Sequence, residues 1–318
     1  MDSRNPFFVT KRKSRAKCPI IIQQQRQRTS QISCVNNFEF YRYRFRFRAL
    51  DVTYFPEGKS GNVVRGALGL ALRSSASPQE YARLFEPCAP AGAPSGFHDL
   101  PRPFVVRAAH LDGRTIESGE RFSLDVHCFD TRNPGLKSFA DAFGLWEKSG
   151  IGPRRGRVRL EEVQPLDLSD GAANGPCAIS LDAGARPVDQ AVVRFVTPTE
   201  LKTAGNVADR PEFGILFARL RDRIGALCAL YGAGPPQIAF RELGERAAAV
   251  RLRRLEIEWE RVERRSGRSG QTHPIGGFTG EAEYEGDLAE FVPWLRAGRW
   301  SGVGRQTVWG KGEVRCEC

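Results

Sequence analysis

Gly298–Gly312, near the C-terminus, has the composition of an anion-binding loop. Its five glycines exclude a helix interior, where each would cost about 1 kcal/mol relative to alanine. They permit a turn whose successive backbone N–H groups face an anion. Arg305 and Lys311 add positive charge, and Trp300 and Trp309 offer surfaces for stacking. This combination favours a nucleic-acid contact over a mononucleotide pocket, and the P-loop pattern is absent. The structural alternative is a turn that packs against a sheet.

General acid–base chemistry near neutral pH would fall to histidine, and the chain has only four. His110 and His127 lie in or beside predicted strands, where we expect structural roles. His98 lies in a loop rich in Pro, Gly and Ala, and His273 in a basic loop that contains glycines. Both loops are long enough to reach a ligand, so these two histidines are the catalytic candidates.

Four stretches between residues 38 and 314 form an ordered signature. They are Gly61–Gly69, Pro101–Val106, Phe195–Lys202 and Gly276–Gly312. Together they resemble the CRISPR-associated endoribonucleases that process precursor crRNA, a family of the RAMP superfamily. The resemblance implies two tandem ferredoxin-like domains.

The resemblance also implies cleavage of RNA within CRISPR repeats, with no metal ion or cofactor. The 2′-hydroxyl attacks the adjacent phosphate and leaves a 2′,3′-cyclic phosphate and a 5′-hydroxyl. The reaction needs a base, an acid and a cation at the phosphorane. DNA lacks the 2′-hydroxyl and should not be cut.

This chain departs from the family where relatives often carry histidine. The end of the second N-terminal helix reads Leu84–Glu86, and Gly302 stands before the Val-Gly pair of the glycine loop. Some members of the family work without a histidine. Ser266 and Arg268 match the family's Ser-x-Arg pattern, so they join the two loop histidines as catalytic candidates.

Arginines alternate with aromatic residues in Phe38–Leu50, so the two kinds of side chain face opposite sides of a strand. The aromatic face should pack beneath helices. The arginine face, which has no acidic residue, is either solvated or lies along a phosphate backbone. The RNA-binding candidates lie on this face or in the four stretches: Arg42, Arg44, Arg46, Arg65, Lys202, Gly302, Gly304, Arg305 and Lys311.

Hydrophobic periodicity predicts an α+β chain with two β-α-β-β-α-β cycles, the ferredoxin-like (RRM-like) arrangement. We expect a disordered basic extension over residues 1–37, a first domain over 38–168, a linker over 169–184 and a second domain over 185–318. Expected strands are 38–50, 104–107, 121–129, 158–163, 191–196, 250–261, 278–284 and 307–315. Expected helices are 63–72, 78–85, 136–148, 213–231 and 288–297. A shift in alternation near Arg253 predicts a bulge.

Composition favours a globular protein in the cytoplasm. The chain of 318 residues has 41% hydrophobic and 27% charged residues, which is typical of folded domains. Its net charge is +11, but eight basic residues against one acid in the N-terminal extension supply most of it. Eight dispersed cysteines without a C-x-x-C pair indicate reduced thiols. No apolar run is long enough to span a membrane.

Two functions of different classes fit the sequence. One is an endoribonuclease that matures precursor crRNA and stays bound to its product. The other is a RAMP-fold RNA-binding subunit of a CRISPR effector complex that does not cleave. Both have repeat RNA as partner and other effector subunits as candidate partners, with no membrane. A third interpretation is an unrelated two-domain protein in which the glycine-rich turn has only a structural role.

Overall fold

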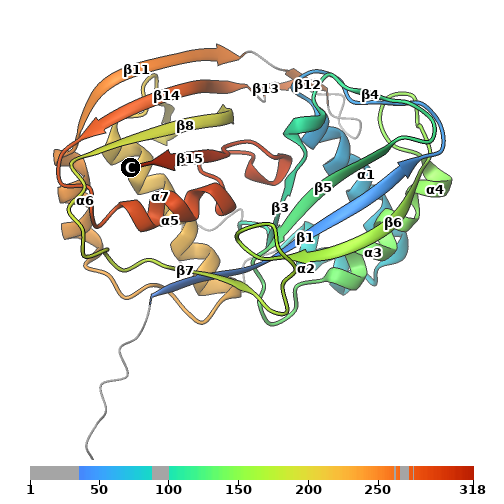
Figure 1. Ribbon diagram of the computed structural model, residues 1–318, viewed down its shortest axis with the longest axis horizontal. Coiled ribbons are helices and arrows are strands. Elements are labelled where there is room, and N and C mark those ends of the chain that lie inside the picture. Colours follow the sequence, from blue (N-terminus) through green and yellow to red (C-terminus); the bar gives the residue numbers. More distant parts are fainter. Residues whose placement is uncertain (1–35, 88–99, 261–262, 266–271, 275) are drawn as a thin grey trace, which may run out of the picture. The chain divides into compact units, whose positions relative to one another are not determined.

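The computed structural model describes residues 36–87, 100–260, 263–265, 272–274 and 276–318 (Figure 1). Most of the predicted N-terminal extension therefore lies outside the described residues. Within them, the chain forms two units that follow one another in sequence, and each unit contains a β-sheet and helices packed against it.

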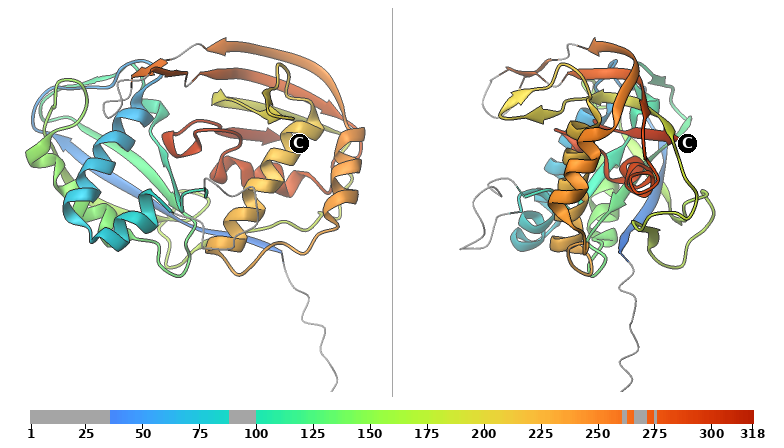
Figure 2. Two further views of the ribbon diagram at one scale, coloured as in Figure 1. Left: turned by 180° about the vertical axis from the view of Figure 1, so that it is seen from behind. Right: turned by 90° about the vertical axis from the view of Figure 1, so that its left-hand side faces the viewer.

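The first cycle builds a ferredoxin-like domain. Its elements are β1 (Asn37–Ala49), α1 (Ser60–Ser75), β3 (Phe104–Arg107), β5 (Arg121–Cys128), α3 (Leu136–Gly144) and β6 (Val158–Leu166). The sheet order is β3-β5-β1-β6 with antiparallel neighbours, as this connectivity requires. In Figure 2 (left), α1 and α3 lie side by side over one face of the sheet. Shorter elements are β2 (Thr53–Tyr54), α2 (Pro78–Phe85), η1 (Ala109–Leu111), β4 (Thr115–Ile116), α4 (Trp146–Ser149) and β7 (Cys177–Ser180).

The second cycle repeats this arrangement. Its elements are β8 (Gln190–Thr199), α5 (Phe213–Tyr231), α6 (Phe240–Ala249), β11 (Arg251–Glu260), β14 (Gly277–Glu285), α7 (Val292–Ser301), η2 (Thr307–Trp309) and β15 (Val314–Glu317). The sheet order is β11-β14-β8-β15, again antiparallel. Two hairpins are added, β9 (Lys202–Thr203) with β10 (Asn206–Val207) and β12 (Glu263–Arg265) with β13 (Thr272–Pro274). The predicted α+β fold of two tandem ferredoxin-like domains is confirmed.

Local differences from the predicted elements have local causes. The predicted last strand over residues 307–315 is wrong, because Gly310 and Gly312 adopt positive φ angles and only Val314–Glu317 is extended. The strand predicted over residues 191–196 is longer in the structure, since β8 continues through Thr197–Thr199 and pairs there with β14. The predicted bulge is confirmed by a register shift between Leu252 and Arg254.

The predicted linker over residues 169–184 contains a strand. β7 pairs with the first residues of β1, with Asn37 opposite Ser180. No helix within the described residues combines the length and apolar character that a bilayer crossing requires.

β1 supplies side chains to two hydrophobic cores. Phe38 and Phe40, near its start, are buried in the core of the second domain. Tyr43, Phe45 and Phe47, farther along, are buried in the core of the first domain beneath α1 and α3. The strand therefore changes the face that it buries as it passes from one domain to the other, and this couples the two cores through one backbone.

Because Phe40 is fully buried and contacts the second core from a strand of the first sheet, we predict that Phe40→Ala lowers the free energy of unfolding by about 3–5 kcal/mol. Urea denaturation monitored by tryptophan fluorescence measures this value. Glu39→Ala, a half-buried neighbour on the same strand, is the control and should cost less than about 1 kcal/mol. Equal losses for the two variants would contradict the shared role of β1.

Candidate nucleic-acid interface

The glycine-rich loop after α7 is the point where the four signature stretches meet. A Cβ at Gly61 would lie 2.1 Å from the carbonyl oxygen of Trp309, and one at Gly304 would lie 2.3 Å from that of Glu200. Gly310 approaches the carbonyl oxygen of Val106. Only glycine permits these backbone contacts, which dock the loop on α1, β3 and the end of β8 (Figure 1).

The basic side chains of the loop are held in different ways. Lys311 is buried, donates to the carbonyl oxygen of Gly58 at 3.3 Å, and has its pKa lowered by burial. Arg305 is exposed and forms an ion pair with Glu200 at 2.6 Å. Arg65, in the first turns of α1, lies over the ring of Trp309 at 5.2 Å. Lys311 and Arg305 thus hold the loop in place through a hydrogen bond and an ion pair, and both side chains add positive charge to it.

A small hollow lies beneath Lys311, and Ala109 on its rim also lines a larger cavity. This larger cavity, which we call the arginine pocket, has a volume of about 440 Å³. It lies between the first sheet and the segment from α7 to β15. Its charged and ionisable lining residues are Arg42, Arg44, Arg107, His110, Asp125, His127, Asp170, Arg299, Glu313 and Arg315.

Two arginines of this pocket are buried and incompletely hydrogen-bonded. Arg42 is 4% exposed, lies 4.4 Å from the ring centre of Trp300 and pairs with Asp170 at 2.9 Å. Arg107 is 9% exposed, and its nearest carboxylate, Glu313, is 3.8 Å away. Within the described residues, Nε of both and Nη1 of Arg107 have no hydrogen-bond partner. Such buried N–H groups can donate to an anionic oxygen at little desolvation cost.

Buried donors also hold the C-terminal end of α7. Arg107 Nη2 donates to the carbonyl oxygen of Arg299 at 2.9 Å, and Arg223 Nε donates to that of Ser301 at 2.8 Å. His127 Nδ1 lies 3.0 Å from the carbonyl oxygen of Trp300, so this nitrogen carries the proton. Burial lowers the pKa of His127 well below its usual value. His127 is therefore neutral and structural, as expected for its strand position.

The predicted open arginine face needs correction. Arg44 forms an ion pair with Asp125 at 2.8 Å and Arg46 one with Glu162 at 2.8 Å, while Arg48 pairs with Glu161. The acids come from β5, which holds Asp125, and from β6, which holds the two glutamates. The sequence of β1 does not show which strands pair with it, so the acidic residues that neutralise its arginines could not be predicted.

Trp300 is also not the stacking surface that the sequence suggested. It is 6% exposed and packs against Phe40 and His127, with ring centres 5.6 and 5.3 Å apart. Lys202 lies in the β9–β10 hairpin and is half-buried. Gly302 and Gly304 have φ angles of 71° and 79°, which the loop's close packing requires.

The candidate catalytic residues are not brought together in the described part of the chain. His98, Ser266 and Arg268 lie outside the described residues. His273 lies in β13, where its backbone pairs with Arg264 of β12. His110, which we expected to be structural, lies exposed at the arginine pocket, with Nε2 2.9 Å from the carbonyl oxygen of Ser123. Its place beside the arginines depends on strand pairing and has no signal in the sequence.

Comparison with family models gives two adjoining matches. Residues 193–314 match the model described as "CRISPR-associated endoribonuclease Cas6". Residues 38–179 match a second model, described as an N-terminal domain. Among curated proteins there is no match.

Solved Cas6 structures share the fold at low sequence identity. Thermus thermophilus Cas6 is 19% identical with a TM-score of 0.54, over 87% of this chain and 98% of its own. A Cas6 product complex is 18% identical with a TM-score of 0.57, over 88% of this chain and all of its own. A partial Cas6–RT–Cas1–Cas2 complex is 10% identical with a TM-score of 0.54, over 88% of this chain and 46% of its own. Residues 193–314 of the chain are thus similar to the Cas6 family of CRISPR-associated endoribonucleases.

Proposed function

We propose that the chain cleaves precursor crRNA within CRISPR repeats. We further propose that it binds the RNA along the surface formed by the glycine-rich loop and the arginine pocket, which we call the RNA seam. The observation that carries this proposal is the continuity of the two sites, since Ala109 lines both the hollow beneath Lys311 and the arginine pocket. Buried donors and exposed arginines along one seam suit a chain of phosphates better than a single small anion.

The proposed reaction is attack of the 2′-hydroxyl on the adjacent phosphate, which gives a 2′,3′-cyclic phosphate and a 5′-hydroxyl. Cations of the seam would neutralise the phosphorane, and a loop residue would move the protons. The candidates remain His98 and His273, with Ser266 and Arg268 as alternatives. Product complexes of similar proteins support the further proposal that the chain stays bound to its product.

A second function is favoured by one observation. Of the two histidines at the arginine pocket, His127 is buried, and His110 donates its Nε2–H to the carbonyl oxygen of Ser123, so that only Nδ1 of His110 could accept a proton there. If the loop candidates also do no proton transfer, the chain would be an RNA-binding subunit of a CRISPR effector complex. The similar Cas6–RT–Cas1–Cas2 complex supports association with other CRISPR proteins, and we propose that both roles are carried out in the cytoplasm.

We predict that the purified chain cuts its own repeat RNA in EDTA, and that a single 2′-deoxy substitution at the cut abolishes cleavage. If His98 or His273 is the base or acid, its alanine variant should lower the single-turnover rate by about 10²–10⁴-fold with little change in RNA affinity. Arg186→Ala, an exposed residue in the loop before β8 and outside the arginine pocket, is the control and should cleave normally. Tight binding without cleavage of the unmodified RNA would establish the second function instead.

We predict that Arg299→Ala and Arg305→Ala each weaken repeat-RNA binding and reduce the slope of log K against log salt by about 0.7–1, because each removes one phosphate contact. Both side chains are exposed, so the fold should tolerate the changes. Titration of labelled RNA at several salt concentrations measures the slope. Arg186→Ala, an exposed arginine in the loop before β8, is the control; an equal fall for this variant would indicate only a general charge effect.

A further inference from the structure

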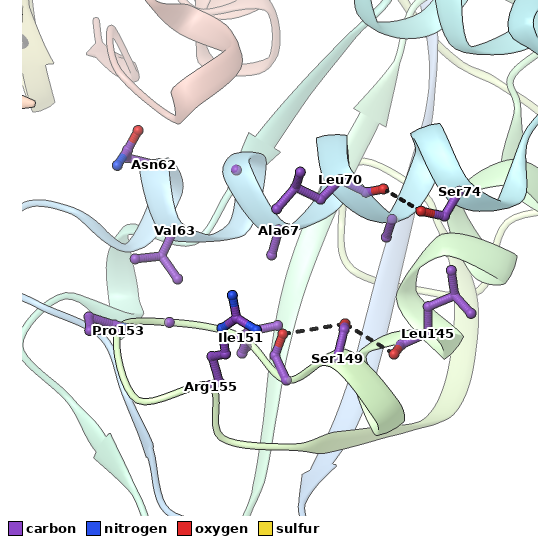
Figure 3. A pocket seen from close by; sticks show the side chains of 14 residues that line it. Asn62, Val63, Ala67, Leu70, Ser74, Leu145, Ser149, Ile151, Pro153 and Arg155 are labelled. Carbon is purple, nitrogen blue, oxygen red and sulfur yellow. Dashed lines mark hydrogen bonds between the residues drawn. The ribbon is translucent and has the colours of Figure 1, made fainter. Parts of the chain in front are cut away.

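A groove of about 390 Å³ lies on the outer side of α1, away from the RNA seam. One wall is the outer face of α1, and the other is the segment from Leu145 to Arg155, which contains α4 (Figure 3). None of its lining residues lines the arginine pocket or the hollow beneath Lys311. The two sites come nearest in sequence at Gly61, which lines the hollow, and Asn62, which lines the groove.

The wall formed by α1 is apolar where a surface helix is usually polar. The inner face buries Val64, Leu68 and Leu72 completely in the core of the first domain. Other apolar side chains of the same helix line the groove, among them Ala67 and Leu70. Leu70 is 74% exposed, more than any other large hydrophobic residue that the structure describes. An apolar second face with an exposed anchor residue is typical of a protein-binding surface.

The opposite wall adds uncompensated positive charge. The guanidinium of Arg155 points across the groove toward α1 (Figure 3), and no lining residue is acidic. Within the described part of the chain, Arg154 and Arg155 have no ion pair, whereas their neighbours Arg157 and Arg159 pair with Asp51 and Glu147. The groove therefore combines an apolar floor with a cation that lacks an acidic partner.

We propose that this groove binds an amphipathic, acidic helix of a partner protein. Apolar groups recur along α1 from Val63 to Ala71, a length of about 12 Å, which matches about two turns of a partner helix. Apolar anchors of the partner lie against Ala67 and Leu70, and a carboxylate reaches Arg155. This docking surface is separate from the proposed RNA seam and does not depend on RNA cleavage.

Two other occupants fit the groove less well. A second copy of the chain docked groove to groove would bring Arg154 and Arg155 of both copies together without an acid between them. RNA would find no aromatic side chain among the lining residues on which to stack its bases. The charge and the apolar lining together therefore favour an acidic protein helix.

The test uses synthetic peptides of about 16 residues, long enough for about four helical turns. One peptide carries leucines on one face and glutamates elsewhere, a second has lysines in place of the glutamates, and a third is a scramble of the first. Fluorescence anisotropy with the full chain at physiological salt measures affinity. We expect the acidic peptide to bind about tenfold or more tightly than the other two.

Leu70→Ser and Arg155→Glu should each weaken binding of the acidic peptide by about tenfold, and Arg155→Glu should strengthen binding of the lysine peptide. Phe240→Ser and Arg186→Glu, which change an exposed hydrophobic residue and an exposed arginine elsewhere, should leave both affinities unchanged. Circular dichroism confirms that each variant is folded.

Three results of the peptide and ultracentrifuge experiments would overturn the proposal, and so would one result of an RNA-binding experiment. The first three are equal affinity for the acidic and scrambled peptides, affinity that Leu70→Ser and Arg155→Glu do not change, and self-association in the ultracentrifuge that Leu70→Ser abolishes. A loss of RNA affinity in the same two variants would also overturn it, because the groove would then be an RNA contact. RNA cleavage is not a readout of this test, so failure of the proposed function leaves it unaffected.

Discussion

The hydrogen bonds at the end of α7 fix most of the geometry described above. The last carbonyl oxygens of a helix carry partial negative charge and have no partner within the helix. Here buried side chains satisfy them: Arg107 and His127 come from the sheet of the first domain and Arg223 from α5 of the second. The glycine-rich loop begins directly after these carbonyls. The start of the loop is therefore held against the first domain. The arginine pocket lies between the sheet of the first domain and the segment from α7 to β15.

Positive charge is distributed unevenly as a result. Along the exposed part of β1, Arg46 and Arg48 are neutralised by glutamates of β6 and contribute little net field. At the seam, Arg42 and Arg107 are buried with unfilled hydrogen-bonding capacity, and the exposed Arg299 lies nearby. Among the described residues, guanidinium N–H groups without a hydrogen-bond partner thus lie at the junction of the two domains, although the sequence spreads arginines along a whole strand.

The glycines of the loop show that packing and anion binding need not be alternatives. Gly304 and Gly312 approach the carbonyl oxygens of Glu200 and Val303 so closely that a Cβ could not fit. Close packing therefore explains why these positions are glycine. The same packing brings Lys311 and Arg305 to the RNA seam. A loop that packs closely against its neighbours can therefore also present the basic side chains that the proposed RNA binding requires.

The sequence by itself determined the two βαββαβ cycles, the bulge in β11 and the aromatic inner face of β1, because hydrophobic periodicity and turn residues are local properties of the chain. The family stretches also pointed to the glycine-rich loop, but that they dock it was not predicted. Tertiary structure alone decided which acids neutralise Arg44 and Arg46, that Trp300 is buried, and that His110 lies beside the arginines. These outcomes depend on pairing between strands that are distant in sequence. A residue's charge partner and its burial are set by the neighbouring strand, and no pattern within one strand encodes that neighbour.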